Sequence, residues 1–307
     1  MMELNDMYDV AFDQAPAYEL LVSLYAYLDK KVYKELDMGK EWLKATRSRL
    51  SPDLAEQLEG KKCCERMKEA SLLLWRCPEE RTPEGFLAWL ERQSPGDLFE
   101  LLAPWMDACP CNIGDIRDGM LSILTDWHEQ YFRHVDPAID AGLARDKAEK
   151  SRKLTGWSAP GIVEEVSGGL YLRPTEALRQ VVLVPQYHAS PAIIVDAYGP
   201  VTILLYPSDA DMTEEGMPPR SLLRLARCLA DESRLRILRF LTDGPRSFTE
   251  IVSHMGLAKS TVSYHMIMLR GAGLVRAYAE GECVQEYTLR REGVKKMEAH
   301  LLDFLKI

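Results

Sequence analysis

The most constraining feature of the 307-residue chain is a run of helix and turn signals between residues 247 and 275. Ser247 and Glu250 form an S-x-x-E capping box, which predicts the start of a short helix, and Gly256 predicts its end. Apolar residues at i, i+4 and i+7 then predict a second helix: Val262, Met266 and Leu269. Two short helices joined by a Gly turn are typical of a helix-turn-helix, whose second helix enters the major groove of DNA.

The flanking segments complete a winged form of this motif. Before it, apolar spacing predicts a helix over about 220–229, and Asp231 can cap the next one. After it, LVRAYA and CVQEYTL flank Glu280-Gly281-Glu282, which predicts two strands around a tight turn, the wing. The sequence therefore predicts a winged helix-turn-helix DNA-binding domain over residues 220–307.

This stretch resembles the ArsR-type winged-helix regulators of bacteria, through LADESRLRILRFL, TEIVSHMGLAKSTVSYHMIMLRGAGLV and the hairpin that ends in EYTL. The resemblance implies a transcriptional regulator, a repressor by preference, that binds an inverted repeat in double-stranded DNA as a homodimer. We expect DNA contacts from ten residues: Ser247, Thr249, Lys259, Ser260, Thr261, Ser263, Tyr264, His265, Arg270 and Arg276. We expect subunit contact from the apolar positions of the last helix: Val294, Met297, Leu301 and Phe304.

The sequence departs from the resemblance at its wing and at its metal-binding positions. The wing tip is acidic, which disfavours contact with phosphate. The helix that carries a Cys-x-Cys pair in metal-sensing members, here 248–255, has no Cys, and the last helix has one His, His300. We therefore expect no metal and no cofactor.

The charge of the chain is divided between its two ends. The net charge is −9, but residues 216–307 hold 15 basic and 10 acidic residues, a net charge of +5, so that the preceding residues carry −14. A basic domain can attract phosphate locally, since distant charges are screened beyond about 8 Å at physiological salt.

The rest of the chain predicts a mainly α protein with small β elements, in the α+β class. Residues 1–155 read as a helical N-terminal domain, with helix starts at Pro52 and Pro83. Residues 156–206 read as its small β part, with three apolar strands: 181–184, 192–197 and 201–206. An acidic segment with Pro and Gly, 207–219, predicts a linker.

Two roles remain open for the N-terminal domain: sensing an unknown small-molecule effector, and dimerisation or protein interaction without an effector. All six Trp precede residue 158 and could line a pocket, although Trp at helical spacing is more often core. A third alternative is a thiol-based metal or redox sensor that uses Cys109 and Cys111, with His128 as a further ligand.

Several classes of protein are not indicated by the sequence. It has no Gly-rich phosphate loop, no G-x-S-x-G and no H-E-x-x-H, so we do not expect an enzyme, and His188 reads as a loop residue. We expect no signal peptide and no membrane segment. Seven cysteines without a disulfide spacing favour reduced thiols in the cytoplasm.

Overall fold

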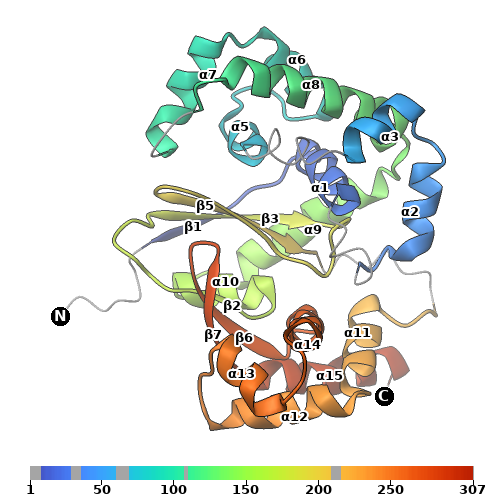
Figure 1. The fold of residues 1–307 in the computed structure, drawn as a ribbon, viewed down its shortest axis with the longest axis vertical. Coiled ribbons are helices and arrows are strands. Elements are labelled where there is room, and N and C mark those ends of the chain that lie inside the picture. Colours follow the sequence, from blue (N-terminus) through green and yellow to red (C-terminus); the bar gives the residue numbers. More distant parts are fainter. Residues whose placement is uncertain (1–7, 29–35, 60–68, 107–109, 209–215, 307) are drawn as a thin grey trace. The chain divides into compact units, whose positions relative to one another are not determined.

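The structure is a computed structural model of the chain. It describes residues 8–28, 36–59, 69–106, 110–208 and 216–306. Contacts between Cα atoms divide the chain into two compact units, each assembled from separate stretches of sequence. The extension unit is Ala11–Ala148 with Gln180–Ala210, and the winged-helix unit is Met1–Val10 with Glu149–Arg179 and Asp211–Ile307. Figure 1 labels most elements of both units.

Four of the described helices of the extension unit begin at a proline. The helices are α1 (Pro16–Leu28), α2 (Gly39–Arg47), α3 (Pro52–Glu59), α5 (Ala70–Arg76), α6 (Pro83–Arg92), α7 (Pro95–Leu102), α8 (Ile113–Gln130) and α9 (Ala138–Lys153), the last of which crosses the unit boundary. The predicted starts at Pro52 and Pro83 are confirmed, and the Thr82 hydroxyl accepts a hydrogen bond from the Gly85 N–H. Among the described residues, no helix combines the length and apolarity that a membrane span requires.

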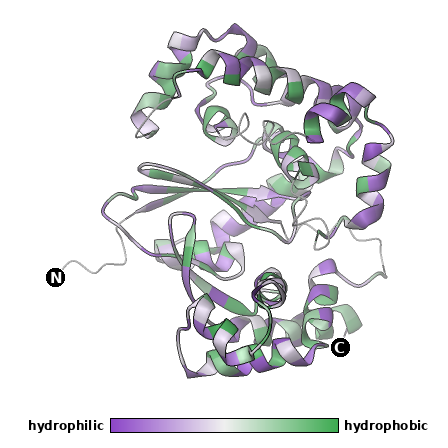
Figure 2. Ribbon diagram, viewed as in Figure 1, coloured by the Kyte–Doolittle hydropathy of each residue, from purple (hydrophilic) through white to green (hydrophobic). Residues whose placement is uncertain are grey.

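A four-stranded sheet with the order β1-β3-β5-β4 lies beneath these helices. Its strands are β1 (Asp9–Phe12), β3 (Gln180–Gln186), β4 (Ile194–Tyr198) and β5 (Val201–Pro207). The strands β3 and β5 are parallel and buried along six consecutive residues each, as their apolar runs predict. Figure 2 shows the same strands as hydrophobic over most of their length. The three predicted strands are confirmed, whereas β1 was not predicted.

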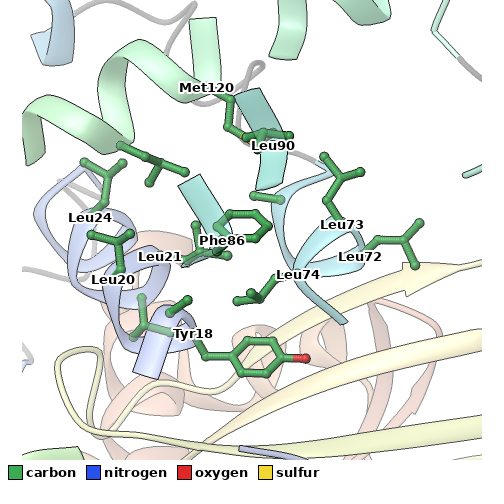
Figure 3. Packing of buried hydrophobic residues seen from close by; sticks show 14 of the residues in the cluster. Tyr18, Leu20, Leu21, Leu24, Leu72, Leu73, Leu74, Phe86, Leu90 and Met120 are labelled. Atoms are coloured by element: carbon green, nitrogen blue, oxygen red, sulfur yellow. The ribbon is translucent and has the colours of Figure 1, made fainter. Parts of the chain in front are cut away.

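The main core of the extension unit lies between α1, α5, α6 and α8, as Figure 3 shows. Its fully buried side chains include Leu20, Leu21 and Leu24 of α1 beside Phe86 of α6. Burying an aliphatic or aromatic side chain of this size stabilises a fold by about 1.5–3 kcal/mol.

Tryptophan contributes to this core. Trp89 and Trp127 are buried, and the Trp127 indole donates a hydrogen bond of 3.0 Å to the Ser23 hydroxyl. Three more pack against the core while partly buried: Trp42, Trp75 and Trp105. Trp157, by contrast, is exposed and belongs to the winged-helix unit.

A chain of hydrogen bonds runs through the apolar interior of the extension unit. The Glu19 carboxyl accepts from the backbone N–H groups of Tyr187 and His188 and lies 2.6 Å from Nδ1 of His188. On the other side of the imidazole, Nε2 of His188 lies 2.8 Å from the Tyr131 hydroxyl, which accepts from the Trp42 indole. Burial raises the pKa of Tyr131 to about 12, so its hydroxyl stays protonated at neutral pH. His188 follows a strand in a loop, as expected, but its side chain is only 1 % exposed.

The winged-helix unit contains the predicted motif and a segment that the sequence did not associate with it. Its elements are α10 (Ala159–Ser167), β2 (Leu170–Leu172), α11 (Arg220–Leu229), α12 (Glu232–Phe240), α13 (Phe248–Met255), α14 (Lys259–Gly271), β6 (Val275–Glu280), β7 (Cys283–Leu289) and α15 (Arg291–Leu305). The mainly helical fold with small sheets and a C-terminal winged helix is thus confirmed.

The strand β2 changes the expected division of the chain. It pairs in parallel with β6, giving a three-stranded sheet with the order β2-β6-β7. We expected residues 156–206 to form one small β part, but 156–179 belong to the winged-helix unit and only 180–206 to the extension unit. The reason is a pairing between strands more than 100 residues apart, which no local pattern reveals.

Candidate nucleic-acid interface

The helix-turn-helix is built as its local signals predict. Ser247 and Glu250 form the expected capping box at the start of α13, and Asp231 accepts from the Arg234 N–H at the start of α12. Gly256 ends α13 with φ of 63°, a left-handed conformation that favours Gly. Ala258 precedes α14 without a side-chain cap.

The inner face of α14 fixes the orientation of this helix. Val262, Met266 and Leu269 are buried, and α14 packs against α11, α12, α13 and β6. His265 is also buried, with Nδ1 4.0 Å from the Asp231 carboxyl.

The outer face of α14 carries five of the ten residues expected to contact DNA. Lys259, Ser260, Thr261 and Ser263 are exposed, and Tyr264 is 44 % exposed. These side chains offer a cation, hydroxyl groups and an aromatic ring to a ligand that approaches this face. Sequence reasoning missed one member of the face, Ile267, which is 43 % exposed.

His265 requires a correction. It was expected beside Tyr264 on the outer face, but it follows Val262 by three residues and therefore falls on the buried side of the helix. Its imidazole lies against Asp231 and does not reach the outer surface in this structure.

Arg276 has a partner that the sequence did not indicate, because its guanidinium is engaged within the unit. It lies in β6, and its Nε donates a hydrogen bond of 2.8 Å to the Glu164 carboxyl of α10. Burial disfavours the charged guanidinium, but the hydrogen bonds that Arg276 donates to Tyr278 and Glu164 raise its pKa. Since Glu164 lies in a segment that was assigned elsewhere, its charge was not considered in the sequence-based expectation.

The remaining expected residues lie at the edges of the face. The Ser247 hydroxyl is used in the capping box, and Thr249 is exposed in the first turn of α13. Arg270 is partly buried near the end of α14.

The α10–β2 segment braces the wing with two acidic side chains. The Glu165 carboxyl accepts a hydrogen bond of 2.7 Å from Nη2 of Arg290 and one of 2.6 Å from Nζ of Lys296. The ion pair between Glu164 and Arg276 lies next to it. The backbone also approaches closely here, since a Cβ on Gly169 would lie 2.4 Å from the Val275 carbonyl oxygen. Three basic groups near the wing are therefore paired with α10.

The described cysteines do not assemble a metal site. Cys109 lies outside the described residues, Cys111 is exposed, and His128 is buried with Nε2 3.1 Å from the Glu84 carboxyl. Within the described ranges, no three His, Cys, Asp or Glu side chains are placed to hold a metal ion. Burial raises the pKa of Cys228 to about 11, which keeps this thiol protonated at neutral pH.

Comparisons with known proteins concern this part of the chain. Residues 231–277 match the family described as "Bacterial regulatory protein, arsR family". The HTH-type transcriptional regulator CmtR of Mycobacterium tuberculosis is 46% identical over 69 residues, which are 22% of this chain and 58% of that protein. The probable mercury resistance operon repressor of Streptomyces lividans is 38% identical over 64 residues, 21% of this chain and 51% of that protein. The transcriptional activator HlyU of Vibrio cholerae is 40% identical over 73 residues, 24% of this chain and 67% of that protein. The chain thus spans about half to two thirds of the length of these relatives.

Solved structures resemble a similar share of the chain. Reduced HlyU from Vibrio cholerae is 35% identical, with a TM-score of 0.22, and the match covers 28% of this chain and 87% of that one. The homodimeric winged helix-turn-helix domain of Mb0332 from Mycobacterium bovis is 28% identical, with a TM-score of 0.23, and covers 27% and 76%.

Proposed function

The chain belongs to the arsR family of bacterial regulatory proteins, and we propose that it is a transcriptional regulator that binds double-stranded DNA through α14. The observation that carries this proposal is the division of α14 into two faces. One face is fixed in the core, and the other presents Lys259, Ser260 and Ser263 outward. A helix held in this way is suited to the major groove, where polar side chains meet base edges and phosphates.

The charge distribution supports the same target. The net charge of +5 in residues 216–307 attracts phosphate, whereas the acidic remainder of the chain is repelled by it. Because Arg276 and Arg290 are paired with glutamates, most of the phosphate contact falls to α14 and its surroundings and not to the wing. A DNA target also places the protein in the cytoplasm.

A homodimer on an inverted repeat is the assembly that we propose. The last helix, α15, exposes several apolar side chains: Val294, Leu301, Leu302 and Leu305. The expected contact residues Met297 and Phe304 are partly buried on the same helix. A second copy of the chain would cover this apolar surface symmetrically, and a two-fold dimer matches two half-sites about one helical turn apart.

For the mode of regulation we propose repression that an effector relieves. The mercury operon protein among the relatives is named a repressor, although HlyU is named an activator. The extension unit has its own core and is the larger addition to the family domain, so we assign to it the sensing of a small molecule or a share of dimerisation. An effector acts only through different affinities for two arrangements of the protein, and the usual coupling changes DNA affinity about 5- to 150-fold.

The proposal is tested with a variant in which Lys259, Ser263 and Tyr264 are all replaced by Ala. Duplexes selected from a random pool by the full chain serve as the DNA. The variant should bind them at least tenfold more weakly, and Lys259→Ala alone should reduce the salt slope by about 1. Lys44→Ala, which removes an exposed lysine of α2, is the control and should change neither value. Unchanged affinity in the triple variant would contradict the assignment of α14.

A further inference from the structure

The outer face of α14 contains an apolar residue where a DNA-binding helix usually carries polar ones. Ile267 is 43 % exposed, although the transfer of a β-branched aliphatic side chain out of water is favourable. Its neighbour on this face, Tyr264, is 44 % exposed. Two adjacent apolar surfaces on the helix that we propose for the major groove need a partner of matching chemistry.

Helix geometry places Ile267 on the outer face, opposite the buried stripe. Ser260, Tyr264 and Ile267 follow each other at i, i+4 and i+7 and so form one stripe. The buried stripe of Val262, Met266 and Leu269 has the same spacing, displaced by two residues, which corresponds to about 200° around the helix. The two stripes are therefore on opposite sides, and the outer one is about 10 Å long, within the roughly 12 Å width of the major groove.

The side chains of this stripe restrict which base features they can recognise. From Lys259 to Ile267 the helix contains no Arg, Asn, Gln, Asp or Glu. Apart from Lys259, it therefore lacks the side chains that pair bidentately with guanine or adenine or accept from cytosine. The major-groove feature that matches an aliphatic side chain is the C5-methyl group of thymine.

We infer that Ile267, next to Tyr264, determines sequence specificity by packing against a thymine methyl group in each half-site of the operator. The inference rests on the proposed DNA binding by α14. The hydroxyls of Ser260 and Ser263 complete the face as adaptable hydrogen-bonding groups, and Lys259 at the first turn serves the phosphates. Discrimination thus comes from shape and apolar contact more than from charged hydrogen bonds.

The experiment is a double-mutant cycle, in which the methyl group is removed from the DNA and the Ile267 side chain from the protein, separately and together. Duplexes are selected from a random pool with the full wild-type chain. Each conserved thymine of the selected half-site is then replaced in turn by deoxyuridine, which lacks only the C5-methyl group. One such replacement should weaken wild-type binding about fourfold, the factor that corresponds to ~0.8 kcal/mol for a buried methyl group. In Ile267→Ala, thymine and deoxyuridine duplexes should bind equally.

A matched control separates this contact from a general loss of surface hydrophobicity. Leu235 of α12 is 48 % exposed, close to the exposure of Ile267, and Leu235→Ala should retain the fourfold discrimination. Since both replaced side chains are exposed, both variants should keep the wild-type melting temperature. The deoxyuridine measurement on the wild type does not depend on the folding of any variant.

The outcomes distinguish this inference from the proposed function. A selected half-site that is insensitive to deoxyuridine, or an Ile267→Ala variant that still discriminates, would overturn the reading of thymine and leave DNA binding intact. If, in addition, Ile267→Ala reduced self-association in sedimentation, the apolar face would be a protein contact. If the full chain enriched no sequence at all, the proposed function itself would fail.

Discussion

The two units of the molecule both enclose glutamate carboxyl groups, but they satisfy them in different ways. In the extension unit, the Glu19 side chain is 3 % exposed and is surrounded by two backbone N–H groups and an imidazole. In the winged-helix unit, the Glu164 and Glu165 side chains are 14 % and 27 % exposed and face the side chains of arginine and lysine. The first arrangement is built into a core, whereas the second joins an appended segment to a family domain.

The difference has an energetic consequence. Losing one partner of a buried charged group costs about 3–5 kcal/mol, because the remaining group has no access to water. A partly exposed pair is worth less, since water and neighbouring groups replace the lost partner. The comparison therefore predicts a gradient, in which the effect of removing a partner falls as the exposure of the carboxyl rises.

The largest effect is expected at His188. Replacing it by Leu removes a hydrogen-bonding partner from Glu19 and another from the Tyr131 hydroxyl, both in the interior. His188→Leu should lower the free energy of unfolding of the extension unit by about 3–5 kcal/mol. Tryptophan fluorescence in urea reports on this unit, because five of the six Trp lie in it.

An exposed histidine supplies the control for this prediction. His134 lies on the surface of the same unit. His134→Leu should leave the free energy of unfolding within about 0.5 kcal/mol of the wild type. A loss below about 1 kcal/mol in His188→Leu would mean that the buried network contributes little, and the contrast between the units would disappear.

A smaller effect is expected at Arg290, whose side chain is 2 % exposed between α10 and the wing. Arg290→Met keeps much of the apolar volume but removes the hydrogen bonds to Glu165 and to the Gly273 carbonyl. Glu165 retains Lys296 and access to water, so we expect a loss of about 2 kcal/mol.

Hydrogen exchange locates this second effect. The Ala277 N–H donates to the Gly169 carbonyl at the junction of β2 and β6, and its exchange should accelerate in Arg290→Met. Arg291→Met changes the exposed neighbour and should leave the rate unchanged. A faster rate in both variants would show that the charge of this region, and not the contact with α10, stabilises the junction.

The sequence revealed those features that depend on neighbouring residues. The capping box at Ser247, the helix start at Pro83 and the strand at 201–206 were all predicted, because caps, turns and apolar runs act within a few residues. The position of Ile267 could also have been predicted, since it follows from the spacing that identified the buried face of α14.

Features that depend on distant partners were not accessible in the same way. The pairing of β2 with β6 joins strands more than 100 residues apart, and the paired segment is only three residues long on each strand, too short to indicate its partner. His188 follows a strand and reads as a loop residue, yet it is enclosed by helices from far earlier in the chain. The pairing of Arg276 with Glu164 was missed for the same reason, because Glu164 could not be placed beside it from local pattern.

The smallest effect of the gradient is expected at Asp231, whose side chain is 33 % exposed at the start of α12. The hydrogen bond from the Arg234 backbone N–H holds the pKa of Asp231 below its usual value. Its stabilisation is therefore complete above the unfolded pKa of about 4 and is lost as the pH falls through the lower folded value. Asp231→Ala should cost about 1 kcal/mol at pH 7, as for other N-caps. Asp231→Asn keeps a capping oxygen, so it should retain most of the stability at pH 7 and lose less than the wild type between pH 5 and pH 2. Equal acid sensitivity in Asp231→Asn and the wild type would show that other carboxyl groups cause the loss of stability between pH 5 and pH 2. Asp231 would then not represent the most exposed carboxyl of the gradient.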